Sequence, residues 1–309
     1  MTTCSSASDK SDCYSIRGQV VVVTGASRGL GRVYAEKFAR LGARVVLIAR
    51  GQERLDEVTN AIRKGGGEAI CVAADVVDQQ SITRAFGVID SYYDHIDLLI
   101  NNAGNLGATG FTWELDAREW WSTLQLHLLG GFYCIQEALR RMVPRRSGRI
   151  ISLASHAGAF RWPTLSAYSV AKAALIKLNE NVAVEAGKHG VALFAFHPGV
   201  VRDTGILPNL QADESTQPAL LDVITWLSQQ VADGHSTTAE QGAAVLVQLA
   251  SGRYDFLNGR YITVYDDLDG LSEQSEQIRH GDAMTMRVVH CEPLGCKRQL
   301  AMMGEEAMV

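Results

Sequence analysis

The sequence predicts an α/β fold in which helices cover both faces of one doubly wound, parallel sheet. Short runs of β-branched and apolar residues alternate with longer amphipathic stretches along most of the 309 residues. Strands that are joined through crossover helices have this pattern. The runs VVVV at 20–23 and LFAF at 193–196 are apolar throughout, which indicates strands that are buried on both faces.

Each element is expected where a run of one periodicity lies between turn residues. The expected strands are Val20–Val23, Val45–Ile48, Ala69–Ala73, Leu98–Asn101, Ile150–Leu153, Val191–Phe196 and Tyr261–Val264. The expected helices are Gly29–Leu41, Glu53–Lys64, Gln79–Tyr92, Asp116–Met142, Ser166–Lys188 and Thr238–Ala250. In the first helix, Leu30, Tyr34, Phe38 and Leu41 recur at helical spacing and predict one buried face. Ligands of such sheets bind at the carboxyl ends of the strands, so a site is expected there.

Residues 17–270 are expected to form a single domain, and three segments stand outside its regular pattern. The polar residues 1–16 predict a disordered leader, and residues 271–309 predict a C-terminal extension that is partly helical. Residues 203–236 are too long for a plain connection and carry apolar residues at helical spacing. They are interpreted either as a lid over a pocket or as an ordinary surface helix that packs on the core.

Composition and charge exclude several classes of function. The formal net charge is −5 and no Lys/Arg block occurs, which argues against nucleic-acid or membrane-surface partners. No apolar run reaches the roughly 18 residues that span a bilayer, and the polar N-terminus lacks the apolar core of a secretion signal. The six cysteines are scattered without metal-ligand spacing and indicate free thiols in a reducing compartment. We therefore expect a cytoplasmic protein without a metal ion.

A glycine-rich loop, TGASRGLG at residues 24–31, joins the first expected strand to the first expected helix. Glycines at such a junction let backbone amides approach a pyrophosphate, whose charge the helix N-terminus stabilises. A plain tight turn would not need three glycines at this spacing, so the context favours a nucleotide site. The candidate contacts in the loop are Gly25, Ser27, Arg28, Gly29, Leu30 and Gly31.

The end of the second strand distinguishes between two dinucleotides. An acidic residue there would bind a free ribose 2′-hydroxyl, whereas an arginine accommodates a 2′-phosphate. This chain has Ala49 and Arg50 at that point, with Arg28 in the glycine loop, which favours NADP over NAD. Further candidate contacts follow later strands: Asp75, Val76, Asn102, Ala103, Gly104, Pro198, Gly199 and Val201. Ordinary turn chemistry would also account for Asp75 and for the Asn-Ala-Gly turn.

A second motif, SLASHAGAFRWPTLSAYSVAK at residues 152–172, contains Ser155, Tyr168 and Lys172. The tyrosine and the lysine are four residues apart, so they share one face of the expected helix. A lysine ammonium beside a phenol lowers the pKa of the phenol. A tyrosine in such surroundings can exchange a proton with an alcohol or a carbonyl, and Tyr168 and Lys172 are also candidate cofactor contacts.

These motifs resemble those of the short-chain dehydrogenase/reductase family. The matching elements are TGASRGLG at 24–31, Asp75, NNAG at 101–104, Ser155, YSVAK at 168–172 and Pro198-Gly199, in order and at family spacing. The resemblance implies a Rossmann fold, a nicotinamide cofactor and hydride transfer to or from a carbon that bears oxygen. It implies that Tyr168 is the general acid/base, that Lys172 lowers its pKa and holds the nicotinamide ribose, and that Ser155 hydrogen-bonds the substrate oxygen. It also implies a homodimer or homotetramer formed through the helices within 116–142 and 166–188.

Three positions depart from the family pattern. The helix after NNAG usually presents an asparagine to a proton-relay water, and His127 stands there. It is interpreted as a relay member or structural substitute, since the imidazole pKa near 6.5 suits a relay, or as a packed histidine without a catalytic role. Asp203 stands where a threonine usually touches the carboxamide, with Thr204 next in the chain. Phe194 occupies a strand position often held by asparagine, which predicts a packing change only.

Apolar residues near the catalytic motif predict the substrate class. His156, Phe160, Trp162 and Leu165 flank the motif, and the apolar stretch 206–227 is expected above it. Such walls suit a mostly apolar carbonyl compound or secondary alcohol. The leading hypothesis is an NADP-dependent oxidoreductase of such a small molecule. The alternatives are a non-catalytic NADP-binding sensor or docking protein, and a non-redox proton transfer such as dehydration.

Overall fold

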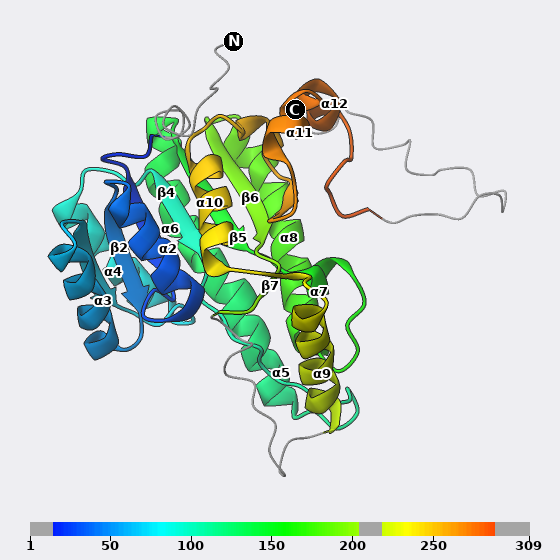
Figure 1. The fold of residues 1–309 in the computed structure, drawn as a ribbon. Helices are drawn as coiled ribbons and strands as arrows, with labels where there is room; N and C mark the ends of the chain where they lie inside the picture. Colours follow the sequence, from blue (N-terminus) through cyan, green and yellow to red (C-terminus); the bar gives the residue numbers. More distant parts are fainter. Residues whose placement is uncertain (1–14, 204–217, 288–309) are drawn as a thin grey trace.

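The computed structural model describes residues 15–203 and 218–287, and one parallel sheet runs through its centre (Figure 1). Its strands are β1 (Val20–Thr24), β2 (Arg44–Ala49), β3 (Glu68–Ala73), β4 (Leu98–Asn101), β5 (Gly148–Leu153), β6 (Val191–His197) and β9 (Tyr261–Thr263). They pair in the order β3-β2-β1-β4-β5-β6-β9, all parallel. The order reverses between β1 and β4, where ligands of doubly wound sheets bind. The predicted fold class is confirmed.

Helices cover both faces of the sheet, as the continuous apolar strands predicted. One face carries α2 (Gly29–Arg40), α3 (Gln52–Lys64) and α10 (Ala239–Ala250), and the other carries α4 (Gln79–Tyr92), α6 (Gly130–Arg145) and α8 (Ser166–Gly187). In β1, Val21 and Val23 pack with the first set, whereas Val20 and Val22 pack with the second. The alternation of side chains along each strand thus divides the apolar residues between two cores.

The helix expected over residues 116–142 is helical without a gap from Ala117 to Arg145, but it contains a π-helical turn that the sequence did not predict. The chain forms α5 (Ala117–Leu124), a π-helical turn (Gln125–Leu129) and then α6. Gly130 follows the turn, and a Cβ added there would lie 2.9 Å from the Val76 side chain. Next to it, Asn101 Nδ2 donates a hydrogen bond to Gly131 O (3.1 Å). This close approach and the hydrogen bond from the Asn101 side chain to the helix backbone account for the π-helical turn between α5 and α6.

The smaller elements lie in the C-terminal half of the chain. They are α7 (His156–Ala159), β7 (Val200–Val201), α9 (Pro218–Ala232), β8 (Ser236–Thr237), a 3-10 turn (Asp255–Leu257), α11 (Leu268–Ser272) and α12 (Ser275–His280). The strands β7 and β8 pair in a small second sheet. The helix expected within 203–236 is α9, whereas residues 204–217 lie outside the described part of the chain.

Two residues just outside the predicted domain boundaries are buried in the core of the domain. Ile16, which the sequence assigned to the leader, is buried in the core on the α2 side of the sheet. Ile278 of α12 is buried in the same core. The extension that begins at residue 271 is therefore packed on the domain at least as far as this helix. Residues 1–14 and 288–309 are not among the described residues.

Two further observations concern the described ranges 15–203 and 218–287. No helix within them is both long enough and apolar enough to cross a membrane. Cys71 and Cys134 are free thiols there. The remaining cysteines, Cys4, Cys13, Cys291 and Cys296, fall outside these ranges.

Candidate active site

The nucleotide loop and the turn after β4 are joined at the carboxyl end of the sheet. Thr24, the last residue of β1, accepts hydrogen bonds at Oγ1 from the backbone N–H groups of Asn102 (2.9 Å) and Ala103 (3.0 Å). The Asn102 side chain donates in return to Thr24 O (2.9 Å). Two adjacent strands thus hold their loops together. Thr24 was not among the predicted site residues, although a polar residue that ends an apolar strand is a visible signal.

Two glycines of the loop occupy positions that a side chain would not fit. Gly25 has a φ of +67°, and a Cβ there would lie 2.9 Å from Ala103 Cα. A Cβ on Gly31 would lie 2.4 Å from Gly25 O. The first glycine therefore allows a left-handed turn, and the second allows α2 to approach the loop closely.

The start of α2 fits a pyrophosphate group. Arg28 is the N-cap residue, its side chain makes no capping hydrogen bond, and the first turn contains no acidic residue. The first N–H groups of the helix therefore have no side-chain cap, and they lie at the positive end of the helix dipole. Such an end binds an anion readily. Gly29 and Leu30 provide the first amides of this helix, and Ser27 precedes the cap.

The other predicted cofactor contacts also follow the strand ends. Arg28 and Arg50 are exposed at this edge. Asp75 follows β3, and its Oδ1 accepts the Val77 N–H (3.2 Å), which is the turn chemistry that the sequence left open. The Val76 side chain is buried. After β6, Pro198 O accepts a hydrogen bond from Thr237 Oγ1 (2.7 Å). Gly199 follows Pro198 in the chain, and Val201 pairs with Thr237 in the β7–β8 sheet.

Ser155, Tyr168 and Lys172 lie together between β5 and α8. Ser155 follows β5 and caps α7, with its Oγ accepting the Ala157 N–H (3.2 Å). The Ser155 hydroxyl is also hydrogen-bonded to the Tyr168 side chain. Lys172 is buried one turn further along α8 and donates from Nζ to Leu153 O (2.6 Å). Its Nζ lies 5.5 Å from the centre of the Tyr168 ring.

Burial dominates the electrostatics of this group. It raises the pKa of the Tyr168 phenol, an effect that the hydrogen bond with Ser155 partly offsets. It lowers the pKa of the Lys172 amine to about 7. The expectation that Lys172 lowers the pKa of Tyr168 below its usual value is therefore wrong for the chain alone. Desolvation is the largest cause of the shift, and the lysine is itself only partly charged near neutral pH.

His127, at the position of the usual asparagine, faces Tyr168. The ring centres are 5.2 Å apart and the ring planes meet at 87°. His127 Nε2 lies 2.8 Å from Asn105 O, so Nε2 carries the proton, because a carbonyl oxygen only accepts. Burial, together with the nearby Lys172, lowers the pKa of His127 to about 3. The expected pKa near 6.5 is therefore wrong, and the ring is neutral at pH 7.

The other ring nitrogen of His127 is available as an acceptor. Nδ1 is buried and has no hydrogen-bond partner within the described residues. A neutral imidazole with its proton on Nε2 has a lone pair on Nδ1. His127 can therefore accept a hydrogen bond beside Tyr168 and Lys172, but it does not gain a proton near neutral pH.

The two other departures from the family pattern have structural explanations. Asp203 Oδ1 accepts the backbone N–H of Ala239 (3.0 Å), so this carboxylate holds the start of α10. Thr204 lies outside the described residues. Phe194 is fully buried in the core on the α2 side of the sheet, consistent with a packing role.

Apolar side chains from separate segments surround Tyr168. The cluster consists of Ala157, Leu165, Tyr168 and Val223, bordered by Leu106, Trp162 and Leu227. Val223 and Leu227 belong to α9. The ring of Trp226 on the same helix contacts that of Trp162, with centres 4.8 Å apart. The helix of the 203–236 insertion therefore packs beside Tyr168 and forms part of its apolar wall.

Two histidines lie next to Ser155. The rings of His156 and His197 are 4.0 Å apart and tilted by 32°. Burial lowers the pKa of both, and that of His197 falls to about 3 with the help of His156 and Lys172. His156 therefore packs on its neighbour, and its burial disfavours the charged form of the ring. His197 was not predicted, although it stands at the end of β6 where site residues gather.

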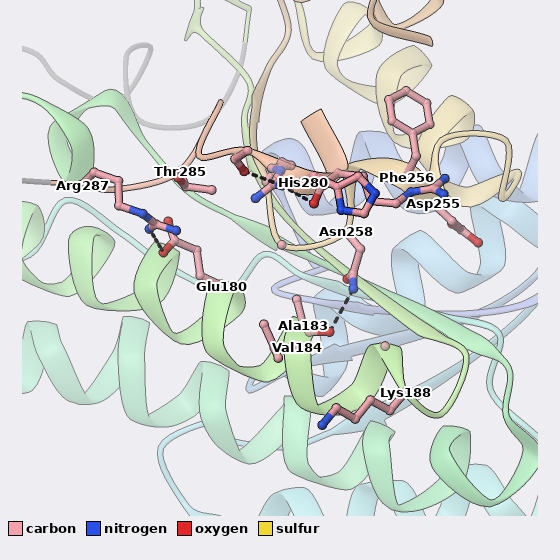
Figure 2. A pocket seen from close by; sticks show the side chains of 15 residues that line it. Glu180, Ala183, Val184, Lys188, Asp255, Phe256, Asn258, His280, Thr285 and Arg287 are labelled. Atoms are coloured by element: carbon pink, nitrogen blue, oxygen red, sulfur yellow. Dashed lines mark hydrogen bonds and ion pairs between the residues drawn. The ribbon is translucent and has the colours of Figure 1, made fainter. Parts of the chain in front are cut away.

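A groove of about 760 Å³ lies elsewhere, along the C-terminal half of α8 (Figure 2). Its lining includes Glu180, Lys188 and Arg287, and it includes none of the three residues Ser155, Tyr168 and Lys172. The candidate active site is therefore defined by the side chains at the strand ends rather than by this groove.

Comparison with known proteins identifies the family. The model of the short chain dehydrogenase family matches residues 19–215. The chain is 30% identical over 253 residues to gluconate 5-dehydrogenase of Gluconobacter oxydans, which covers 82% of this chain and 95% of the relative. It is 29% identical over 256 residues to 3beta-hydroxysteroid dehydrogenase of Mediterraneibacter gnavus, with coverages of 79% and 92%. A crystal structure of a dehydrogenase/reductase from Sinorhizobium meliloti matches with a TM-score of 0.71 at 26% identity, covering 83% of this chain and 97% of that one.

The chain belongs to the short-chain dehydrogenase/reductase family. The resemblance inferred from the motifs is confirmed. The protein is therefore an oxidoreductase that acts on CH–OH or C=O groups with a nicotinamide cofactor. Two features fit that cofactor. A Cβ on Gly25 or Gly31 would clash with the backbone, and the start of α2 has no side-chain cap.

Proposed function

We propose that the protein is an NADP-dependent oxidoreductase that interconverts a ketone or aldehyde with the alcohol of a mostly apolar small molecule. The observation that carries the proposal is the hydrogen-bonded pair Ser155–Tyr168 beside the buried Lys172. We further propose that it works in the cytoplasm as a homodimer or homotetramer.

Each catalytic residue has a role that its surroundings set. The bound nicotinamide supplies or accepts the hydride. Tyr168, whose pKa is raised by burial, holds its proton at neutral pH and donates it to the substrate oxygen when a carbonyl is reduced. Ser155 hydrogen-bonds the same oxygen as charge develops on it. Lys172, with a pKa of about 7, holds the nicotinamide ribose and returns a proton to Tyr168.

His127 completes this set as an acceptor. Its Nδ1 atom is buried and has no hydrogen-bond partner among the described residues. The Lys172 amine is close enough to lower the pKa of the His127 ring. We propose that Nδ1 accepts a hydrogen bond from a water that also contacts Lys172, in place of the usual asparagine. This role needs only a lone pair, and it suits a ring that remains neutral.

The preference for NADP rests on the charge at the end of β2. Ala49 leaves no carboxylate there that would repel a 2′-phosphate, and Arg50 follows immediately. Arg28 is exposed at the adjacent loop. Guanidinium groups bind phosphate with paired, directional hydrogen bonds. Gly25 and Gly31, at which a Cβ would clash with the chain, allow the close backbone packing that a pyrophosphate-binding loop needs.

The apolar substrate class rests on the lining of the site. The side chains clustered with Tyr168, from Leu106 through Val223 and Leu227, are all apolar. A pocket that buries a ligand against such side chains favours apolar ligands. The two relatives described above are named for a sugar acid and for a steroid, and the apolar lining supports the more apolar of these two classes.

The test is Tyr168→Phe in the full-length protein. Loss of the phenolic proton should lower turnover of NADPH with an apolar ketone about 1,000-fold, within the range for general acid catalysis. NADPH affinity, measured by fluorescence titration, should stay within about threefold. Tyr92→Phe is the matched control, because Tyr92 is exposed at 63% on α4.

Three outcomes would contradict the proposal. Full activity of the Tyr168→Phe protein would remove the tyrosine from its role. NADPH binding without turnover across a broad panel of carbonyls and alcohols would favour the non-catalytic alternative. Product formation without stoichiometric nicotinamide turnover would favour a non-redox proton transfer.

A further inference from the structure

One face of α8 connects the catalytic residues to the C-terminal segment 284–287. Tyr168, Lys172, Ile176 and Glu180 follow one another at intervals of four, so they share a face of the helix. All four are buried. The first two belong to the candidate catalytic set. The last two contact residues 284–287, which we call the strap.

Glu180 attaches the strap to α8 through both carboxylate oxygens. Its Oε1 accepts the backbone N–H of Met286, and its Oε2 pairs with Arg287 Nη1 (3.1 Å) and with Lys177 Nζ (2.7 Å). Figure 2 shows Arg287 and Glu180 facing each other across this junction. The Glu180 side chain is only 7% exposed. A buried carboxylate needs such partners. Loss of Glu180 would leave the Met286 N–H and the Arg287 guanidinium without their acceptor, and loss of these partners would leave the Glu180 carboxylate unpaired.

The strap also contacts the sheet next to the catalytic serine. Tyr261 of β9 donates its backbone N–H to Met284 O (2.8 Å), so the strap lies along the outer edge of the sheet. The Met286 side chain packs in one cluster with Ala154, Ile176 and Ala195. Ala154 directly precedes Ser155, and Ile176 lies one turn after Lys172. Met286 therefore packs against a cluster that joins the residue before Ser155 to the helix that carries Tyr168 and Lys172.

From this arrangement we propose that Glu180 is a positioning residue, which acts through the strap to set the distance between Ser155 and the pair Tyr168–Lys172. Glu180 lies eight residues past Lys172, about 12 Å along the helix axis, so it touches no reacting atom. The strap links α8 at Glu180 to the edge strand β9 at Tyr261. Small displacements of catalytic groups can lower turnover by up to about 100-fold. This inference rests on the proposed catalytic roles of the three residues.

The experiment compares Glu180→Leu, Glu180→Gln and Met286→Ala with Glu185→Gln as the matched control. Glu185 is an exposed glutamate on the same helix. All variants are assayed well below their melting temperatures, with circular dichroism as a check of folding. For Glu180→Leu we expect kcat to fall at least about tenfold, with KM for NADPH and for the carbonyl within about threefold. Met286→Ala should also lower kcat and leave both KM values nearly unchanged. Glu180→Gln, which still accepts the Met286 N–H, should lose less, and Glu185→Gln should match the unmodified protein.

A second readout does not depend on turnover. Amide hydrogen exchange, followed by mass spectrometry, should be faster in segments 153–158 and 168–176 of Glu180→Leu than in the Glu185→Gln protein. A Glu180→Leu protein that melts earlier but keeps its kcat within twofold would show a purely structural role and overturn the inference. If the unmodified protein shows no turnover, the proposed function fails. Hydrogen exchange alone then tests whether Glu180 positions the segments that carry Ser155, Tyr168 and Lys172. Unchanged exchange in both segments would overturn the inference in that case.

Discussion

The nucleotide end and the catalytic end of the site are built from different kinds of groups. At the nucleotide end, the eight consecutive residues 24–31 supply backbone amides, glycines at which a Cβ would clash with backbone atoms, and the exposed Arg28, and Arg50 lies exposed at the end of β2. At the catalytic end, side chains from residues as far apart as His127 and Val223 are buried against one another. The first end is defined by local backbone geometry. The second depends on tertiary packing, which shifts the pKa values of its groups.

The largest expected effect at the nucleotide end follows from Gly31→Ala. A Cβ there would lie 2.4 Å from Gly25 O, which is a backbone atom that cannot move aside without deforming the loop. We expect NADPH affinity to fall at least about 100-fold, since the amides that face the pyrophosphate would be displaced. Fluorescence titration of the folded protein measures this loss.

Gly87→Ala is the control for this change. Gly87 lies within α4, and a Cβ there would meet nothing within 4 Å. Alanine in such an open helix position should stabilise the protein by about 0.5–1 kcal/mol and leave NADPH affinity unchanged. A Gly31→Ala protein that binds NADPH as tightly as this control would show that the loop does not hold the cofactor.

A smaller loss is expected from Arg50→Ala. Removal of one guanidinium from a phosphate should weaken NADPH binding about 30-fold, in the range for a hydrogen bond to a charged group, while NADH binding stays within about threefold. Arg32→Ala is the control, because Arg32 is exposed and pairs with Glu36 on the same helix. Equal losses for the two dinucleotides would contradict the NADP preference and leave only the general nicotinamide site.

The same contrast explains which parts of the molecule could be predicted from the sequence. The strands and the glycine loop depend on apolar runs and on residues that are neighbours in the chain, so local patterns suffice for them. The π-helical turn that ends before Gly130 was not predicted, because this part of the helix closely approaches Val76, which is remote in sequence. The pKa directions of Tyr168 and His127 were missed for a related reason. Their sign is set by burial, and burial is decided by segments such as α9 that fold over the site.

The catalytic end can be tested by the pH dependence of stability. The pKa of Lys172 is lowered from 10.5 to about 7 in the folded protein. Between these two values the unfolded chain binds a proton that the folded chain does not bind. The free energy of unfolding should therefore rise with pH from about 7 to about 10, with a slope of up to about 1.4 kcal/mol per unit.

Comparison with Lys172→Met isolates this contribution. Methionine has no titrating group, so the difference in unfolding free energy between the two proteins should grow with pH in favour of the unmodified chain. Urea denaturation at three pH values in this window measures the difference. A difference that does not change with pH would show that Lys172 is charged in the folded protein, and that burial does not govern this end of the site.

The smallest effect is expected from His127→Asn. The pKa of His127 is lowered to about 3, so the ring is neutral throughout the range in which the protein is assayed, and only its Nδ1 lone pair is available. An asparagine side-chain oxygen also accepts hydrogen bonds. We therefore expect kcat within about fivefold of the unmodified value and a pH–rate profile of unchanged shape between pH 5 and about 9. His127→Leu, which removes the acceptor, serves as the comparison for packing. A step near pH 6 that disappears in His127→Asn would mean that the imidazole itself carries the proton, because a buried neutral ring cannot produce it.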